Sequence, residues 1–302
     1  MFKTIYPGKR YLCLCLLYNI HGDLRAVEEN ARQVIALSEE NMLKSTTIHA
    51  FYFLGMLHYW QDNLDESIRH MEVILNNRYA VRPVYYAICA YTRGLIYLAQ
   101  GQGEDAKQMV ELVLAYGIEQ ENSMIMELAH AFDIELALRQ ENKIEAQRLV
   151  SGVKFDLYPP LWLDFHSQLT RIKALLATGL PENEQEAERQ LDHWYQFGRS
   201  THNTAFLIQV MALQAMLLHQ QKKNPAALKK LNAALVLGEP GGFIRTFVDL
   251  GSPMMDLLQQ LQNKKVLSNY VQKILSAYKG ETQDLIPGDK NNPMVSSHGS
   301  LA

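Results

Sequence analysis

The sequence predicts an all-α fold in which helical hairpins stack side by side into a solenoid. First, a small residue recurs at nearly constant spacing, with steps of 41, 39, 40, 41 and 40 residues. Second, apolar residues within each repeat are spaced by three and four, the period of an amphipathic helix. Third, the sequence has no alternating apolar pattern of strand length between its Gly and Pro breaks. The recurring small residues are Ala26, Ser67, Ala106, Ala146, Ala187 and Ala227.

The hairpin between residues 48 and 79 shows the repeat most clearly. Gly55 and Ser67 lie twelve residues apart in helical patterns, where small residues are costly unless another backbone approaches closely. Phe51 precedes Gly55 by four residues, and Met71 follows Ser67 by four. This hairpin resembles a tetratricopeptide repeat, which implies a right-handed superhelix. The steps exceed the usual repeat length of about 34 residues, so we expect longer helices or longer connections.

The first hairpin begins with a stretch that imitates a secretion signal. Lys9-Arg10 precede an apolar run at 11–20, but no small-residue cleavage site follows. Leu24 and Val27 instead continue a helical pattern directly after the turn at Gly22-Asp23. We therefore expect a hairpin helix here. No apolar run reaches the roughly 20 residues that span a bilayer, so we expect no membrane contact.

The later hairpins vary the same pattern. In the third, Gly94 precedes Ala106 by twelve residues, as in the second hairpin. In the fourth, Ile134 takes the place of the small residue, and Pro159-Pro160 marks the break before the fifth. The sixth has Ala215 at this position. Polar turns are expected at Gly22-Asp23, Asp62-Asn63, Gly101-Gln102-Gly103, Glu141-Asn142, Glu182-Asn183 and 222–224.

The pattern divides the chain into three parts. Residues 1–237 are predicted to contain six hairpins, and residues 238–279 to form capping helices that end the solenoid. Ser252 and Pro253 suit the N-cap and the first position of one capping helix. Residues 280–302 are rich in Gly, Pro, Asn and Ser, and we predict a flexible linker or tail.

The composition favours a sizeable core and disfavours nucleic-acid binding. Of the 302 residues, 48% are hydrophobic, and the formal net charge of -3 gives no electrostatic footprint for nucleic acid. Three cysteines without metal-ligand spacing indicate unpaired thiols in a reducing compartment, so we predict a cytoplasmic location. No pair of histidines has metal-binding spacing on one helix, so no metal site is predicted.

A denser pattern lies at residues 233–258. Its residues are Glu239, Pro240, Gly242, Phe243, Arg245, Phe247, Asp249, Gly251, Met254 and Leu257-Leu258. A later match lies at Asn269-Tyr270-Val271 and Ile274-Leu275. These residues resemble the end of the sensor region in MalT-type activators, the large LuxR-family bacterial transcription regulators with a signalling ATPase. The resemblance is close over 233–278 and loose over the six hairpins.

The resemblance implies a sensor region that controls two other modules, an upstream ATPase and a downstream helix-turn-helix domain. The ATPase phosphate-binding loop is missing, since Gly101 and Gly103 lie in a turn and lack the lysine. The sequence also contains no helix-turn-helix of the LuxR type, so we expect that module to lie outside it. We therefore expect an isolated sensor region that binds a small-molecule effector or a regulatory protein. It is expected to need no cofactor, to make no direct nucleic-acid contact and to be able to form a homo-oligomer.

The expected binding site is the concave face, which the first helix of each hairpin lines in tetratricopeptide arrays. Aromatic side chains beside charged ones can stack on and hydrogen-bond a sugar or another polar metabolite. The same aromatic residues can instead pack between hairpins, and both interpretations stay open. The candidate ligand-binding residues are His49, Tyr52, Tyr59, Trp60, Tyr91, Glu135, Arg139 and Arg171.

Two other functional classes are considered. The first is a free-standing scaffold that binds a peptide or protein and needs no DNA-binding module. The second is an enzyme, for which His130, Asp133 and Glu135 are the nearest group of catalytic residue types. No nucleophile on a strained turn accompanies them, so we predict no catalytic residues and no enzymatic activity.

Overall fold

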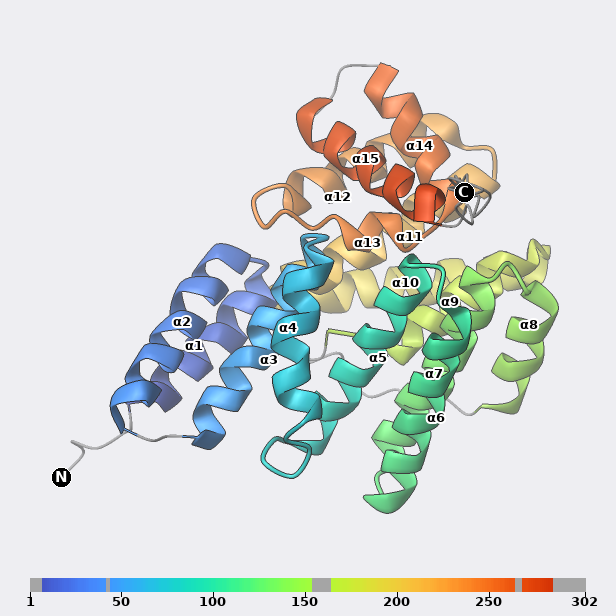
Figure 1. The fold of residues 1–302 in the computed structure, drawn as a ribbon. Coiled ribbons are helices and arrows are strands. Elements are labelled where there is room, and N and C mark those ends of the chain that lie inside the picture. The colour runs from blue at the N-terminus through green and yellow to red at the C-terminus, as the bar shows by residue number, and fades with distance from the viewer. Residues whose placement is uncertain (1–6, 42–43, 154–163, 264–267, 285–302) are drawn as a thin grey trace, which may run out of the picture.

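The computed structural model describes residues 7–41, 44–153, 164–263 and 268–284, and its regular elements are all helices within these ranges (Figure 1). Paired helices pack against each other and against the next pair, which confirms the predicted hairpin solenoid. The pairs are α1 (Pro7–His21) with α2 (Leu24–Asn41), α3 (Lys44–Trp60) with α4 (Leu64–Leu75), α5 (Pro83–Ala99) with α6 (Gly103–Glu119), α7 (Ser123–Arg139) with α8 (Lys143–Gly152), α9 (Ser167–Thr178) with α10 (Pro181–Ser200), and α11 (Thr204–Gln220) with α12 (Asn224–Gly238).

The close packing within the second hairpin depends on its two small residues. The Ser67 hydroxyl is buried and donates a hydrogen bond of 2.8 Å to the carbonyl oxygen of Gly55. A Cβ atom on Gly55 would lie 2.9 Å from Cγ of Met71 on the facing helix. Gly55 and Ser67 therefore let the backbone of α3 approach α4.

In the first hairpin, Val27 and not Ala26 takes the position of Ser67. The Val27 N–H bonds to the Asp23 carbonyl as the Ser67 N–H bonds to that of Asn63. Val27 is buried, whereas Ala26 is half-buried. Cys15, twelve residues earlier, contacts the Val27 carbonyl through its thiol at 3.7 Å. The small-residue pattern misses this position because a cysteine faces a valine here.

The turn of the fifth hairpin lies earlier than predicted. Gly179 ends α9 with a φ of 65°, a left-handed conformation that glycine adopts easily. α10 begins at Pro181, because proline fits the first helical position. Glu182-Asn183 therefore lie inside α10. The predicted break at Pro159-Pro160 lies outside the described residues.

The array curves until its two ends meet. α1 contacts α11, and α13 (Arg245–Val248) contacts α3. The backbone N–H of Ile244 donates to the carbonyl of Trp60 at 2.7 Å, and the Gln61 amide donates to the carbonyl of Gly241 at 3.2 Å. The curvature thus brings the capping residues 238–279 against the second hairpin, and α13 lies at the end of α3 (Figure 1).

The capping helices lie across α11 and α12 (Figure 1). α14 (Ser252–Asn263) begins one residue earlier than predicted, because Ser252 is its first residue and the Gly251 carbonyl before it accepts from the Met255 N–H, and α15 (Ser268–Asp284) follows. Two tyrosine hydroxyls fix α15: Tyr270 donates to the Phe243 carbonyl at 2.7 Å and Tyr278 to that of Phe247 at 2.6 Å. α15 continues past residue 280, where a tail was predicted. Of the described helices, none has the length and apolar character of a membrane span.

Replacing Gly94 with alanine is expected to destabilise the array. A Cβ atom there would overlap the Phe132 ring of α7 and lie 3.1 Å from Cβ of Met109 on α6. Overpacking of this kind costs about 1–3 kcal/mol, which a lowered urea midpoint would report. Gly152→Ala is the matched control, because a Cβ atom on Gly152 meets nothing within 4 Å. Equal midpoints for the two variants would show that the contact at Gly94 is unimportant.

Candidate functional site

The interior of the curve is lined by aromatic side chains from two successive hairpins. Tyr52, Tyr59 and Trp60 come from α3 and Tyr91 from α5, and all four are buried. Burial raises the pKa of the Tyr52, Tyr59 and Tyr91 hydroxyls well above its usual value, so they stay protonated as donors. This lining combines ring faces with hydroxyl and indole N–H donors.

The chain itself fills part of this interior. Residues 164–166, which we call the inner segment, precede α9 and lie against the aromatic lining. The Phe165 ring packs among three of these rings, with centroid distances of 4.4 Å to Tyr91, 5.6 Å to Trp60 and 6.1 Å to Tyr59. His166 meets Phe206 of α11 edge-on at 4.7 Å. The inner segment therefore bridges α3, α5 and α11.

Asp164 places a carboxylate in a niche of uncharged donors. Its Oδ2 accepts a 2.5 Å hydrogen bond from the Tyr52 hydroxyl. Its Oδ1 accepts one of 3.0 Å from the Asn19 amide and a longer one of 3.4 Å from the Trp60 indole. Asp164 forms no ion pair with any of the described residues. Burial raises the pKa of Asp164, and the hydrogen bonds from Tyr52, Asn19 and Trp60 only partly offset this effect.

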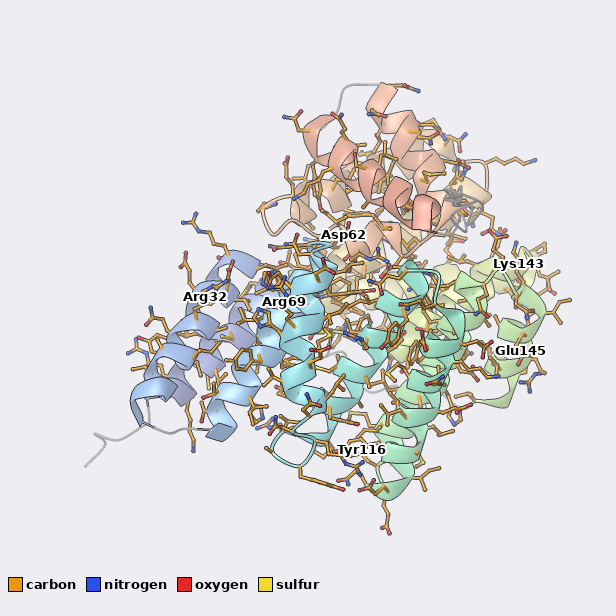
Figure 2. The ribbon with its side chains drawn as sticks, in the orientation of Figure 1. Arg32, Asp62, Arg69, Tyr116, Lys143 and Glu145 are labelled. Atoms are coloured by element: carbon orange, nitrogen blue, oxygen red, sulfur yellow. The ribbon has the colours of Figure 1, made fainter. Side chains whose placement is uncertain are left out.

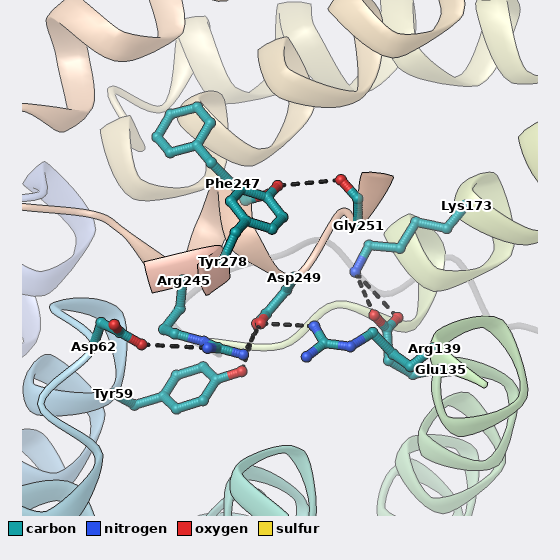
Figure 3. A network of polar contacts seen from close by, with 10 residues as sticks. All are labelled: Tyr59, Asp62, Glu135, Arg139, Lys173, Arg245, Phe247, Asp249, Gly251 and Tyr278. Carbon is teal, nitrogen blue, oxygen red and sulfur yellow. Dashed lines mark hydrogen bonds and ion pairs between the residues drawn. The ribbon is translucent and has the colours of Figure 1, made fainter. Parts of the chain in front are cut away.

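A second carboxylate, Asp249, lies at the end of α13 in the opposite electrostatic setting (Figure 3). Arg245 Nη2 lies 2.5 Å and Arg139 Nη1 2.7 Å from its Oδ1, and the Tyr59 hydroxyl donates to its Oδ2 at 2.5 Å. The other Arg245 nitrogen, Nη1, pairs with Asp62 at 3.2 Å. We call these five residues the central ion network. It joins α3, α7 and α13.

The charges of the central ion network compensate one another. The Asp249 side chain is only 9% exposed, and that of Arg245 only 1%. Burial raises the pKa of Asp249, but the charges of Arg245 and Arg139 and the Tyr59 hydrogen bond outweigh it and lower the pKa to about 2. By contrast, Arg32, Arg69 and Glu145 form pairs within single helices on the outer surface (Figure 2). The interior charges instead connect hairpins that are far apart in the sequence, whereas the surface pairs Arg78–Glu119 and Arg93–Glu72 join only the neighbouring second and third hairpins.

Little free volume remains between these groups. One cavity of about 40 Å³ lies between the inner segment, α13 and the partly buried ion pair of Glu135 with Lys173, whose atoms approach to 2.9 Å. A second, of about 10 Å³, lies on the Asn19 side of the inner segment. A water molecule needs at least ~10–15 Å³ of such volume. The interior as described therefore has room for water but not for a sugar.

Six of the eight candidate residues are brought together by the structure. Tyr52, Tyr59, Trp60 and Tyr91 contact the inner segment, Glu135 pairs with Lys173, and Arg139 with Asp249. The other two lie apart from this group. His49 meets Tyr85 edge-on at 5.5 Å, and Arg171 is half-buried on α9, where its charge acts on Glu186 of α10. Ligand binding by these residues stays a prediction.

The sequence-based prediction missed several charged residues of the interior, among them Arg245, Asp249 and Asp164. Arg245 and Asp249 are four residues apart in the mostly apolar stretch 243–250, at the start and just after the end of α13. Two opposite charges one helical turn apart in an apolar stretch indicate a buried ion pair. That spacing was a usable signal. Asp164 had none, because its partners are more than a hundred positions away in the sequence. Among the described residues, no three side chains form a group able to hold a metal ion.

Comparison with known proteins identifies a family. The family model described as the MalT-like TPR region matches residues 10–264. The match includes all six hairpins, α13 and α14, and therefore both the inner segment and the central ion network. No curated protein matches the chain significantly.

Replacing Asp249 with asparagine is expected to destabilise the fold strongly. The variant leaves the buried guanidinium groups of Arg245 and Arg139 without their shared anion. Breaking a buried ion pair costs about 3–5 kcal/mol, measurable by urea unfolding. Glu186→Gln is the control, because Glu186 pairs with Arg189 on the surface, where such pairs contribute about 1 kcal/mol or less. Similar losses in both variants would contradict a special role for Asp249.

Replacing Asp164 with asparagine is expected to stabilise the protein at pH 7. An asparagine keeps an acceptor for Asn19 and Trp60 and can donate to the Tyr52 oxygen, without a buried charge. Because the pKa of Asp164 is raised on folding, the charge reduces stability as pH rises through that pKa.

The stability gain from Asp164→Asn should therefore shrink as pH falls toward the ordinary pKa of about 3.9. Among the described residues, the titratable groups that interact electrostatically with Asp164 are Tyr52, Tyr85 and Cys89, and none of them is a cation. Paired thermal unfolding curves between pH 4 and pH 8 would measure the difference. A variant less stable than the parent at pH 7 would show that the carboxylate itself is needed.

Proposed function

Because the chain belongs to the family of MalT-like TPR regions, we propose that it is the effector-sensing and protein-interaction region of a LuxR-family bacterial transcription regulator. In such a regulator it would work in the cytoplasm beside an ATPase and a helix-turn-helix domain. The proposal requires no catalysis and no cofactor of the segment itself. The observation that carries it is the enclosed interior, which is lined by aromatic and polar groups and joined directly to the capping helices.

The proposed effector site is this interior, the concave side of the array. Tyr91 and Trp60 offer ring faces, while Glu135, Lys173 and Thr170 line the larger cavity with polar groups. Such a mixture suits a small polar molecule with an apolar part. The present cavity is too small, so binding would require the interior to rearrange.

The central ion network offers a route from the interior to the C-terminal helices. Arg139 of α7 pairs with Asp249 at the end of α13 (Figure 3), and the carbonyl of Phe247 in α13 accepts a hydrogen bond from the Tyr278 hydroxyl of α15. An effector that changes the position of α7 would change the docking of α15. Such coupling requires that the effector bind the two arrangements with different affinity.

A thermal-shift screen of sugars, amino acids, nucleotides and related metabolites tests direct sensing. A ligand at about a hundred times its Kd stabilises the protein by about 2.7 kcal/mol. The thermal shift caused by a ligand that binds in the interior should disappear in Gln209→Phe. Gln209 borders both cavities, and the larger phenylalanine side chain would fill them. Gln262→Phe on the exposed face of α14 is the matched control and should keep the shift.

The outcomes separate the alternatives. A shift that persists in Gln209→Phe would place the effector elsewhere. A blank across the panel would favour a protein partner over these small molecules. A gene that encodes a phosphate-binding loop before this segment and a helix-turn-helix after it would support the regulator. A gene without them would favour a free-standing scaffold.

A further inference from the structure

The inner segment is held in the way that a receptor holds a bound ligand. Its carboxylate contacts α1 and α3, its ring contacts α3 and α5, and its imidazole contacts α11, and Asp164 and His166 are buried. The groups that receive Asp164 and Phe165 come from α1, α3 and α5, far from the inner segment in sequence. The niche is thus built by the hairpins and occupied by a separate part of the chain.

We propose that this niche binds a small aromatic carboxylic acid, and that the inner segment occupies it when the acid is absent. The inference rests on the proposed sensing function and deepens it by naming the ligand class. Asp164 and Phe165 stand in for the carboxylate and the ring of the acid.

The donors determine the charge of the ligand. The indole N–H of Trp60 can only donate, and the Tyr52 hydroxyl and Asn19 amide also donate to the same carboxylate. Three donors that converge on two oxygens match a carboxylate, which only accepts. An ammonium group, which only donates, could not accept the hydrogen bond from the Trp60 indole. The niche therefore selects against a cation.

The rings determine the other half of the ligand. Phe165 touches Tyr91, Trp60 and Tyr59, and its centroid lies only 4.4 Å from that of Tyr91. These distances fall in the range of favourable aromatic pairs. A carboxylic acid that carries an aromatic ring, such as 3-phenylpropionate, combines the same two groups, and Trp60 contacts both of them in the niche.

Two observations indicate that the inner segment is replaceable. First, no cation among the described residues pairs with Asp164, so its burial is only partly compensated. Second, cavities lie on both sides of the inner segment, and one is bordered by the hydroxyl of Thr246, which is buried without a hydrogen-bond partner among the described residues. Departure of the inner segment would join these cavities and expose that hydroxyl to a ligand.

The test compares 3-phenylpropionate binding to the unaltered chain and to Asp164→Ala/Phe165→Ala by calorimetry. In the unaltered chain the acid must displace the docked inner segment, which lowers its apparent affinity by the fraction of molecules with an empty niche. We expect the double variant to bind more than about tenfold tighter, which corresponds to a niche filled in over about nine of ten molecules. The NMR signal of the Trp60 indole N–H should shift on binding.

Three controls keep the result specific. 3-Phenylpropylamine should bind the double variant at least about tenfold more weakly than the acid, because the Trp60 indole N–H can only donate and the emptied niche no longer holds the Asp164 carboxylate that could pair with a cation. Tyr52→Phe in the double variant should lower the affinity for the acid, because it removes the donor of the shortest hydrogen bond in the niche. Asp164→Asn, which keeps the niche filled without a buried charge, should bind no tighter than the unaltered chain. Phe165→Ala alone replaces the double variant if the latter does not fold.

Equal affinity of the acid for the unaltered chain, Asp164→Asn and the emptied variant would overturn the proposal, and so would equally tight binding of the amine. That failure would leave the sensing function intact with another ligand. Conversely, tight binding by the emptied variant supports the niche even if the metabolite screen of the unaltered chain is blank. The two proposals can therefore fail separately.

Discussion

The structure depends on the contact between its two distant ends. Ile244 of the capping segment donates its backbone N–H to Trp60, and Arg245 reaches Asp62 in the turn after α3. A solenoid ordinarily contacts only its neighbouring repeats, and its stability is then a sum of local terms. Here the contact closes the array, so a change at either end acts on both. It also covers the interior, so the charged side chains buried there are paired or hydrogen-bonded by other protein groups.

The fold could be predicted because its determinants are local. Helical spacing, small residues at the close approach of Gly55 and Ser67, and turn residues all act within one hairpin. The predictions that failed concern positions where another residue performs the same task. Cys15 opposite Val27 replaces a small pair, and Gly179 with Pro181 forms a turn that Glu182-Asn183 seemed to offer. The closure was not predictable, because no local pattern specifies the curvature summed over six hairpins.

Of the candidate site, the sequence predicted the inward face of α3 but not the inner segment that packs against it. Counting helical positions from Gly55 identified Tyr52, Tyr59 and Trp60 as one inward face, since helix geometry fixes which residues share a face. It could not reveal that the inner segment packs there. Asp164 lies 112 positions from Tyr52, and nothing in the sequence near either residue specifies that pairing. Arg245 and Asp249 were visible as part of a family pattern, but their burial and their link to Arg139 required the structure.

The two interior carboxylates, Asp249 and Asp164, have different roles in the molecule. Asp249 is surrounded by two arginines, and its lowered pKa shows that the folded state favours its charge. Such a group holds elements together, because its removal leaves buried cations unpaired. Asp164 is held by neutral donors alone, and its raised pKa shows that the folded state disfavours its charge. The protein therefore fastens its ends at Asp249, and it can exchange the group at Asp164 with less loss of free energy.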